Sequence, residues 1–247
     1  MYPYWIFILV AVVTFAASFI QGATGFGFGI FAMIFLPKLL LYTEANILSS
    51  LLSALSALFV AGLTFRKIHW KNILFPIFGC LISTYIAVSF ISSQSSQVLS
   101  LLLGIALLLL SIYFICFSDK IRIRPSWYAG LIAGVLSGIL GGMFSIGGPP
   151  VVVYFLQSED DFDHYFATIS AYFVLSGTVS VSTKIAAGFM TGSTWIALAI
   201  STVTLMIGAY VGKRTKDRIN PAVIRKLVYG VMAISGLMNI ITTLVRF

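Results

Sequence analysis

Two glycine-rich stretches contain the residues of this sequence that are best suited to bind a small anion. The first runs from Gln21 to Gly29 and the second from Gly141 to Pro150, and each interrupts a long apolar segment. Backbone inside a membrane leaves the helical conformation only where it is buried in protein or lines a wet cavity. Paired helix breaks of this kind form the substrate site of many transporters. The two stretches therefore predict a binding site, which we expect to lie between them.

Each stretch offers neutral hydrogen-bond donors. A helix that restarts after a Gly-rich turn presents free backbone N–H groups and the positive end of its dipole, which together favour an anion. Glycine lets backbone approach a ligand closely, and proline suits the first turn of a helix because it needs no N–H partner there. The predicted substrate-binding residues are Gln21, Gly22, Thr24, Gly25, Gly27, Gly29, Gly142, Ser145, Gly147, Gly148 and Pro149. Close helix packing is the alternative role for such glycines, and we expect it for the separate stripe Gly130, Gly134 and Gly138.

The few ionisable residues near the apolar segments suggest a route for a coupling proton. Glu44 and His164 occupy equivalent positions 120 residues apart, and titratable groups inside membranes often relay protons. Asn46 and Ser170 lie just beyond them and are candidates to line the pathway. The alternative is that Glu44 begins a helix and that His164 belongs to a solvated acidic loop. Lys184 is the lone basic residue of its connection, where we expect it to anchor at the membrane surface or to attract anions from outside.

The sequence indicates no cofactor, no metal site and no enzyme. Cys80 and Cys116 lie in apolar segments without metal-ligand spacing, so we expect packing residues and no disulfide. Ser145 and His164 superficially suggest a serine hydrolase pair, but this histidine falls in an acidic stretch that we expect to be aqueous. No carboxylate pair or metal cluster appears in the apolar segments.

Composition places the chain in a lipid bilayer. Of its 247 residues, 60% are hydrophobic and only 9% are charged, and the mean hydropathy is +1.05; soluble domains carry about a quarter charged residues. The net charge of +8 comes from short basic clusters between apolar segments, which is typical of cytoplasmic loops, so we expect no nucleic-acid partner. The apolar segments are approximately 4–41, 45–65, 72–91, 97–117, 126–157, 165–188, 192–212 and 221–245.

The first and fifth of these segments are too long for a single crossing. The 38 residues of the first would reach about 57 Å as a helix, against a hydrocarbon core of about 30 Å. Each contains one glycine-rich stretch, so each is predicted to be two short helices joined by a turn. Residues 21–30 also map onto residues 141–150 with an offset of 120. We therefore predict an all-α integral membrane protein of two inverted repeats, 1–120 and 121–247, each starting with a Gly-broken helical hairpin followed by three transmembrane helices.

The distribution of basic residues predicts the topology. If the first and fifth segments enter and return, Lys38, Lys184 and Arg246 lie on one side of the membrane. The twelve on the other side are Arg66, Lys67, Lys71, Lys120, Arg122, Arg124, Lys213, Arg214, Lys216, Arg218, Arg225 and Lys226. The positive-inside rule places these twelve in the cytoplasm and both termini outside the plasma (inner) membrane. Full crossings and re-entrant hairpins give the same sidedness.

The two glycine-rich stretches resemble those of a known family. Residues 21–27 and 142–149 are similar to the paired signatures of the TauE/SafE sulfite-exporter family, also called the toluene sulfonate uptake permease superfamily. The resemblance covers the full length and implies secondary transport, or facilitated passage, of sulfite, sulfonates or other small organosulfur anions. Ser145 is the repeat equivalent of Gly25, where a strict repeat would have a second glycine. The two halves of the site are therefore expected to differ. A passive anion channel and a non-transporting membrane scaffold stay open as alternatives, and the resemblance gives no oligomeric state.

Overall fold

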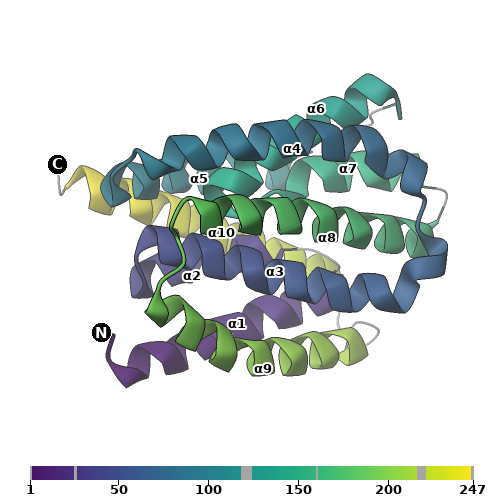
Figure 1. Cartoon of the computed structure of the whole chain (residues 1–247). Helices are drawn as coiled ribbons and strands as arrows, with labels where there is room; N and C mark the ends of the chain where they lie inside the picture. Colours follow the sequence, from purple (N-terminus) through teal and green to yellow (C-terminus); the bar gives the residue numbers. More distant parts are fainter. Residues whose placement is uncertain (1, 25–26, 118–123, 160, 216–220, 246–247) are drawn as a thin grey trace. The chain divides into compact units, whose positions relative to one another are not determined.

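Ten α-helices and one short 3₁₀ turn make up the part of the chain that the structure describes (Figure 1). This computed structural model describes residues 2–24, 27–117, 124–159, 161–215 and 221–245. The elements are α1 (Tyr4–Thr24), α2 (Phe28–Leu39), α3 (Tyr42–Thr64), η1 (Phe65–Lys67), α4 (Trp70–Ser92), α5 (Ser96–Phe117), α6 (Trp127–Phe144), α7 (Gly148–Ser158), α8 (Phe162–Ala186), α9 (Gly192–Thr215) and α10 (Pro221–Leu244). The predicted all-α membrane fold is confirmed, and six of these helices are long and apolar enough to cross a bilayer.

Both predicted helix breaks are present. The segment 4–41 is divided into α1 and α2, and the segment 126–157 is divided into α6 and α7. Gly27 precedes α2 with a φ of 101°, a left-handed conformation that glycine adopts without steric cost. At the second break, Pro149 and Pro150 lie in the first turn of α7. Backbone N–H groups there have no partner within the helix, so proline, which lacks this group, costs no hydrogen bond. Local sequence therefore determines where each long segment stops and restarts.

The helices form two compact units, each assembled from separate parts of the chain. Unit 1 comprises Met1–Ser49, Ser93–Lys120 and Met190–Phe247, and unit 2 comprises Ser50–Ser92 and Ile121–Phe189. Each unit draws on both predicted repeats, because α1 packs on α9 in unit 1 and α6 packs on α4 in unit 2. The division of the sequence into inverted halves 1–120 and 121–247 stays a prediction.

In unit 2, α6 lies against α4 at backbone contact distance. A Cβ added at Gly134 would lie 1.9 Å from the carbonyl oxygen of Pro76, and one added at Gly138 would lie 2.0 Å from the Ser83 hydroxyl. Glycine is therefore required at these two positions for the helices to approach so closely. This confirms the predicted packing role of the stripe, which is how helices associate where the hydrophobic effect does not drive them together.

In unit 1, α1 packs on α9 through an equivalent contact between a glycine and a serine. Here the serine belongs to α1 and the glycine to α9, whereas in unit 2 the glycine belongs to α6 and the serine to α4. A Cβ added at Gly208 of α9 would lie 2.1 Å from the Ser18 hydroxyl of α1. Ser18 is 120 residues before Gly138, and Ser83 is 125 residues before Gly208. The same helix contact thus occurs twice, as expected for a duplicated chain.

The outer faces of the helices are apolar. On α4, Leu74, Phe78 and Ile82 are 63%, 59% and 55% exposed, and their spacing of four residues places them on one helix face. An exposed apolar stripe of this length is costly in water and suited to contact with lipid tails. Packing and exposure together support a multi-pass membrane protein.

Gly134→Ala is expected to destabilise unit 2 by about 1–3 kcal/mol or more, because the new methyl group would collide with the carbonyl of Pro76. The matched control is Gly230→Ala in α10, since an added Cβ at Gly230 meets no atom within 4 Å. That substitution should be neutral or stabilising by up to about 1 kcal/mol, the helix-propensity gain of alanine over glycine. Thermal unfolding of both variants in detergent would measure the difference, and equal melting temperatures would contradict close packing at Gly134.

Candidate functional site

The second break ends α6 in a strained turn. Ser145 closes the helix with φ 57° and ψ 25°, and it is the only non-glycine residue with a positive φ among the described residues. Its backbone N–H donates to the Gly141 carbonyl at 3.0 Å, and the next N–H, that of Ile146, donates to Leu140 at 3.1 Å. A left-handed conformation costs a non-glycine residue roughly 1–2 kcal/mol. Strain of this kind persists where surrounding contacts impose it, and it is frequent at binding sites.

The side chain of Lys184 reaches this turn from α8. It is fully buried, and its ammonium donates to the Ser50 hydroxyl at 2.7 Å, the Gly141 carbonyl at 3.1 Å and the Ser145 hydroxyl at 3.2 Å. The Ser50 and Ser145 hydroxyl oxygens are themselves 2.7 Å apart and hydrogen bonded. All three N–H donors of the lysine are thereby used. The ammonium also lies at the C-terminal end of α6, where the helix dipole favours a cation.

This position corrects the expectation for Lys184. The residue was expected to anchor at the membrane surface or to attract anions from outside, but it belongs to the last turn of α8 and points into unit 2. The signal that identifies it is its isolation, because no other lysine or arginine occurs between Arg124 and Lys213. Between Asp163 and Lys213 it is also the only charged residue, and a lone charge in an apolar stretch indicates a functional residue.

The other predicted residues of the second break divide between packing and the turn. Gly142 faces α4, where an added Cβ would lie 2.7 Å from the Ala87 side chain, and Gly147 lies against the Ser137 carbonyl at 2.8 Å on the same measure. Gly148 has ordinary contact space, and Pro149 is buried in the first turn of α7. Gly142 therefore serves the helix interface, whereas Gly147 allows the chain to fold back on α6.

The first break is described only in part. Gln21 is buried and its Oε1 atom has no hydrogen-bond partner among the described residues. Gly22 lies against α9, where an added Cβ would be 2.5 Å from the Ala209 carbonyl oxygen, and Gly29 is buried within α2. Gly25 and the side chain of Thr24 lie outside the described residues. Gln21 is thus the residue of this break with an unused polar atom, while packing accounts for Gly22.

Glu44 is a buried carboxylate surrounded by hydroxyl groups. It accepts hydrogen bonds from Tyr2 at 2.6 Å, Thr191 at 2.6 Å and Ser193 at 2.7 Å. No basic side chain forms an ion pair with it in the described part of the chain. Asn46, two residues after Glu44 in α3, is fully buried. The three hydroxyl donors stabilise the ionised form of the carboxylate. The predicted proton role of Glu44 stays a prediction.

Comparison with known proteins assigns the family. The model of the family described as "Sulfite exporter TauE/SafE" matches residues 10–239. The chain belongs to this family. It is also 26% identical over 223 residues to a curated protein of Cupriavidus necator named "Probable sulfite/organosulfonate exporter TauE", a match that covers 88% of this chain and 87% of that protein. No solved structure matches the chain significantly.

Membership of the TauE/SafE family makes the chain a membrane transport protein and not an enzyme. The local contacts agree with this assignment, because the two members of the imagined hydrolase pair have other partners. Ser145 bonds to Ser50 and Lys184, while the His164 ring bonds to Asp161. The Ser170 hydroxyl is hydrogen bonded to the Phe166 carbonyl of its own helix at 2.6 Å.

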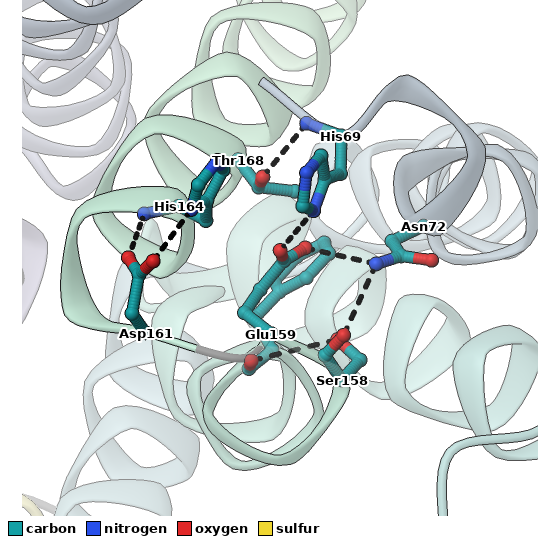
Figure 2. A network of polar contacts seen from close by, with 8 residues as sticks. His69, Asn72, Ser158, Glu159, Asp161, His164 and Thr168 are labelled. Carbon is teal, nitrogen blue, oxygen red and sulfur yellow. Dashed lines mark hydrogen bonds and ion pairs between the residues drawn. The ribbon is translucent and has the colours of Figure 1, made fainter. Parts of the chain in front are cut away.

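His164 belongs to a polar network at one end of unit 2 (Figure 2). Its ring stacks on that of His69, with centroids 4.5 Å apart, and each imidazole contacts a carboxylate: His164 contacts Asp161 at 2.8 Å and His69 contacts Glu159 at 2.6 Å. The Asn72 amide donates to the fully buried Glu159 side chain at 2.9 Å. The network therefore joins the start of α4 to the connection between α7 and α8.

Two further contacts extend this network. The His69 backbone N–H donates to the Thr168 hydroxyl at 3.1 Å, and Lys67 forms an ion pair with Asp163. The hydrogen bond from Lys67 to the Asp163 carboxylate raises the pKa of the lysine. The predicted acidic surroundings of His164 are thus confirmed for Asp161, and the proton role of the histidine stays a prediction.

Asp161 caps α8 by accepting a hydrogen bond from the His164 backbone N–H at 2.9 Å. This bond, and then the bond from the His164 ring, lower the pKa of the carboxyl group. Because the folded state depresses this pKa, the stabilisation is present above the ordinary value of about 3.9 and is lost as pH falls through the lower folded value.

We expect Asp161→Ala to lower the melting temperature more than Asp161→Asn at neutral pH, because asparagine still caps the helix. Wild-type melting temperature should fall between pH 5 and pH 3, in part because the Asp161 carboxylate becomes protonated. In Asp161→Asn this part of the fall should be absent. Melting curves across pH would test both points. Identical curves for the two variants would show that the cap contributes nothing.

Proposed function

We propose that this protein is a secondary carrier that moves a small sulfur oxyanion, such as sulfite or an organosulfonate, across the plasma membrane. The single observation that carries this proposal is the buried Lys184 ammonium at the α6–α7 break. A cation held beside a helix break is the group that a membrane-embedded anion site needs. Family membership and the name of the Cupriavidus necator relative support sulfur oxyanions as the substrate class.

In this proposal the main binding site is the α6–α7 break, which lies in unit 2. Ser145, Gly147 and Gly148 shape the turn, and the dipole of α7 directs its positive end towards it. Gln21 at the first break stays a predicted contact in its own right; the atom without a partner among the described residues is its amide oxygen, an acceptor that cannot donate to an anion. Access would alternate between the two sides of the membrane, as in other carriers built from repeats. Glu44 and His164 are the candidates for proton coupling.

The proposed topology places the basic connection Arg66–Lys71 in the cytoplasm and the uncharged connection around Ser93 outside. We expect a cysteine at Lys71 to react with a membrane-impermeant maleimide only after the cells are opened. A cysteine at Ser93 should react in intact cells. Both would be introduced into a chain in which Cys80 and Cys116 are replaced. Labelling of the Lys71 position in intact cells would reverse the proposed orientation.

Counterflow in proteoliposomes tests the function. With sulfite, methanesulfonate, sulfoacetate, acetate and chloride as trial anions, we expect saturable flux of a sulfur oxyanion. Gly147→Leu should reduce that flux by about tenfold or more, a loss of at least 1.4 kcal/mol in the interactions of the site. The reason is steric, because even a Cβ at Gly147 would lie 2.8 Å from the Ser137 carbonyl oxygen.

Gly230→Leu is the matched control, since that glycine has free space around its Cα. Non-saturating conductance would support an anion channel instead of a carrier. Absence of flux for every anion in a folded protein would support a membrane scaffold. A pH gradient that drives uptake would implicate a coupling proton.

A further inference from the structure

The ammonium of Lys184 has no counter-ion within the described residues. The ion pairs found there join Lys67 to Asp163, His69 to Glu159 and His164 to Asp161. The partners of Lys184 are two hydroxyl groups and one carbonyl, which are neutral. Hydrogen bonds to neutral oxygens reduce the cost of burying a charge but leave the charge itself uncompensated. When protonated, Lys184 therefore gives the α6–α7 break one positive charge without a negative partner among the described residues.

Three polar atoms form a triangle beside this break. They are the Lys184 ammonium from α8, the Ser50 hydroxyl from α3 and the Ser145 hydroxyl from the end of α6. The edges of the triangle measure 2.7 Å, 3.2 Å and 2.7 Å. Lysine carries three donors, and each hydroxyl rotates to donate in a different direction. The three groups come from three separate helices, and each can donate to one oxygen of a group with three equivalent oxygens when it exchanges its present hydrogen bond.

A buried hydroxyl on the same face of α8 adds to this set. Ser180 lies one turn before Lys184, and residues four apart share a helix face. Its Oγ atom is buried and has no hydrogen-bond partner among the described residues. An unpartnered buried hydroxyl of this kind indicates a place for a water molecule or a ligand. Gly141 and Ser145 are only partly buried, so the break gives access to the triangle.

The backbone of α7 cannot supply the same recognition alone. Pro149 and Pro150 occupy its first turn and carry no N–H group. The helix dipole remains, but two of the donors that usually bind an anion at a helix N-terminus are missing. Side-chain donors must therefore provide most of the hydrogen bonds to an anion at this break.

We propose that the triangle of Lys184, Ser50 and Ser145 binds the –SO3 group of a monovalent anion, a sulfonate or hydrogensulfite, and that Lys184 supplies its counter-charge. This inference rests on the proposed function and specifies the charge of the substrate. One anionic charge neutralises the ammonium, whereas a second would be buried without a partner at high cost. A divalent anion such as sulfate is therefore excluded by charge, although its size is similar. Binding would exchange the bonds that the ammonium makes to the two hydroxyls and the Gly141 carbonyl for bonds to the substrate oxygens.

The experiment compares three tetrahedral sulfur compounds of similar size. Dimethyl sulfone is neutral, methanesulfonate is monovalent and sulfate is divalent at pH 7.5. Titration calorimetry with the full chain in nanodiscs would measure their dissociation constants. We expect methanesulfonate to bind at least about tenfold more tightly than either of the others. Equal or tighter binding of sulfate would overturn the monovalent site.

Variants assign the binding to the triangle. Lys184→Met should weaken methanesulfonate binding by at least about tenfold, and Lys38→Met, which removes an exposed charge, should leave it unchanged. Because Lys184 also caps α6, its loss could prevent folding, so Ser50→Ala and Ser145→Ala form a second test. Each should weaken methanesulfonate binding severalfold with Lys184 in place. Unchanged affinity in these two variants would overturn the triangle.

Transport separates this inference from the proposed function. If the wild-type protein moves methanesulfonate and sulfate equally well, the carrier function is supported and the selection for a monovalent anion is rejected. Failure of the wild-type protein to move any sulfur anion would reject the carrier itself. Saturable methanesulfonate counterflow that sulfate does not inhibit would support both.

Discussion

The hydrogen bonds from the buried Lys184 ammonium to the end of α6 are the interaction on which the second break depends. A helix that stops inside a membrane leaves its last carbonyl groups without partners, and lipid cannot supply any. Lys184 gives the Gly141 carbonyl a second hydrogen bond beside that from the Ser145 backbone N–H, and it also fixes the hydroxyl of the strained Ser145. One side chain therefore reinforces the end of the helix, stabilises the left-handed turn and places an amine there.

Close backbone packing holds these groups in position. Gly134 and Gly138 bring α6 against α4, and the Tyr172 hydroxyl of α8 donates to Ser137 of α6 at 2.8 Å within the same unit. Apolar surface is no driving force between helices in lipid, so van der Waals contact and interhelical hydrogen bonds must do this work. The position of Lys184 relative to the turn is set by these contacts, which leave little freedom for α8 to slide along α6.

The sequence was sufficient to predict features that depend on local residue types. Helix length, glycine and proline predicted both breaks, and spacing by four predicted the packing stripe. Spacing by four also continues the stripe to Gly142 and places Gly22 on the equivalent face of α1. The sequence thus indicates a packing role for both glycines beside the predicted substrate role. Lys184 was misplaced because its contacts join residues 134, 43 and 39 positions apart, and no local pattern shows how far a lysine side chain reaches. The hydroxyl groups of Tyr2 and Thr191 around Glu44 lie 42 and 147 positions away in the sequence and were unpredictable for the same reason.

The exchange of serine and glycine between the two helix pairs has a consequence for assembly. The predicted duplication would give each of these helices a near-copy, so that α1 could pair with α9 or α4, and α6 with α4 or α9. Pairing α1 with α4 would set Ser18 against Ser83 where the observed contacts leave room for one side chain, and pairing α6 with α9 would set Gly138 against Gly208 and leave a void. Each wrong pairing is thus penalised by a collision or a hole. The exchanged serine and glycine therefore favour the observed helix pairs over the alternative ones.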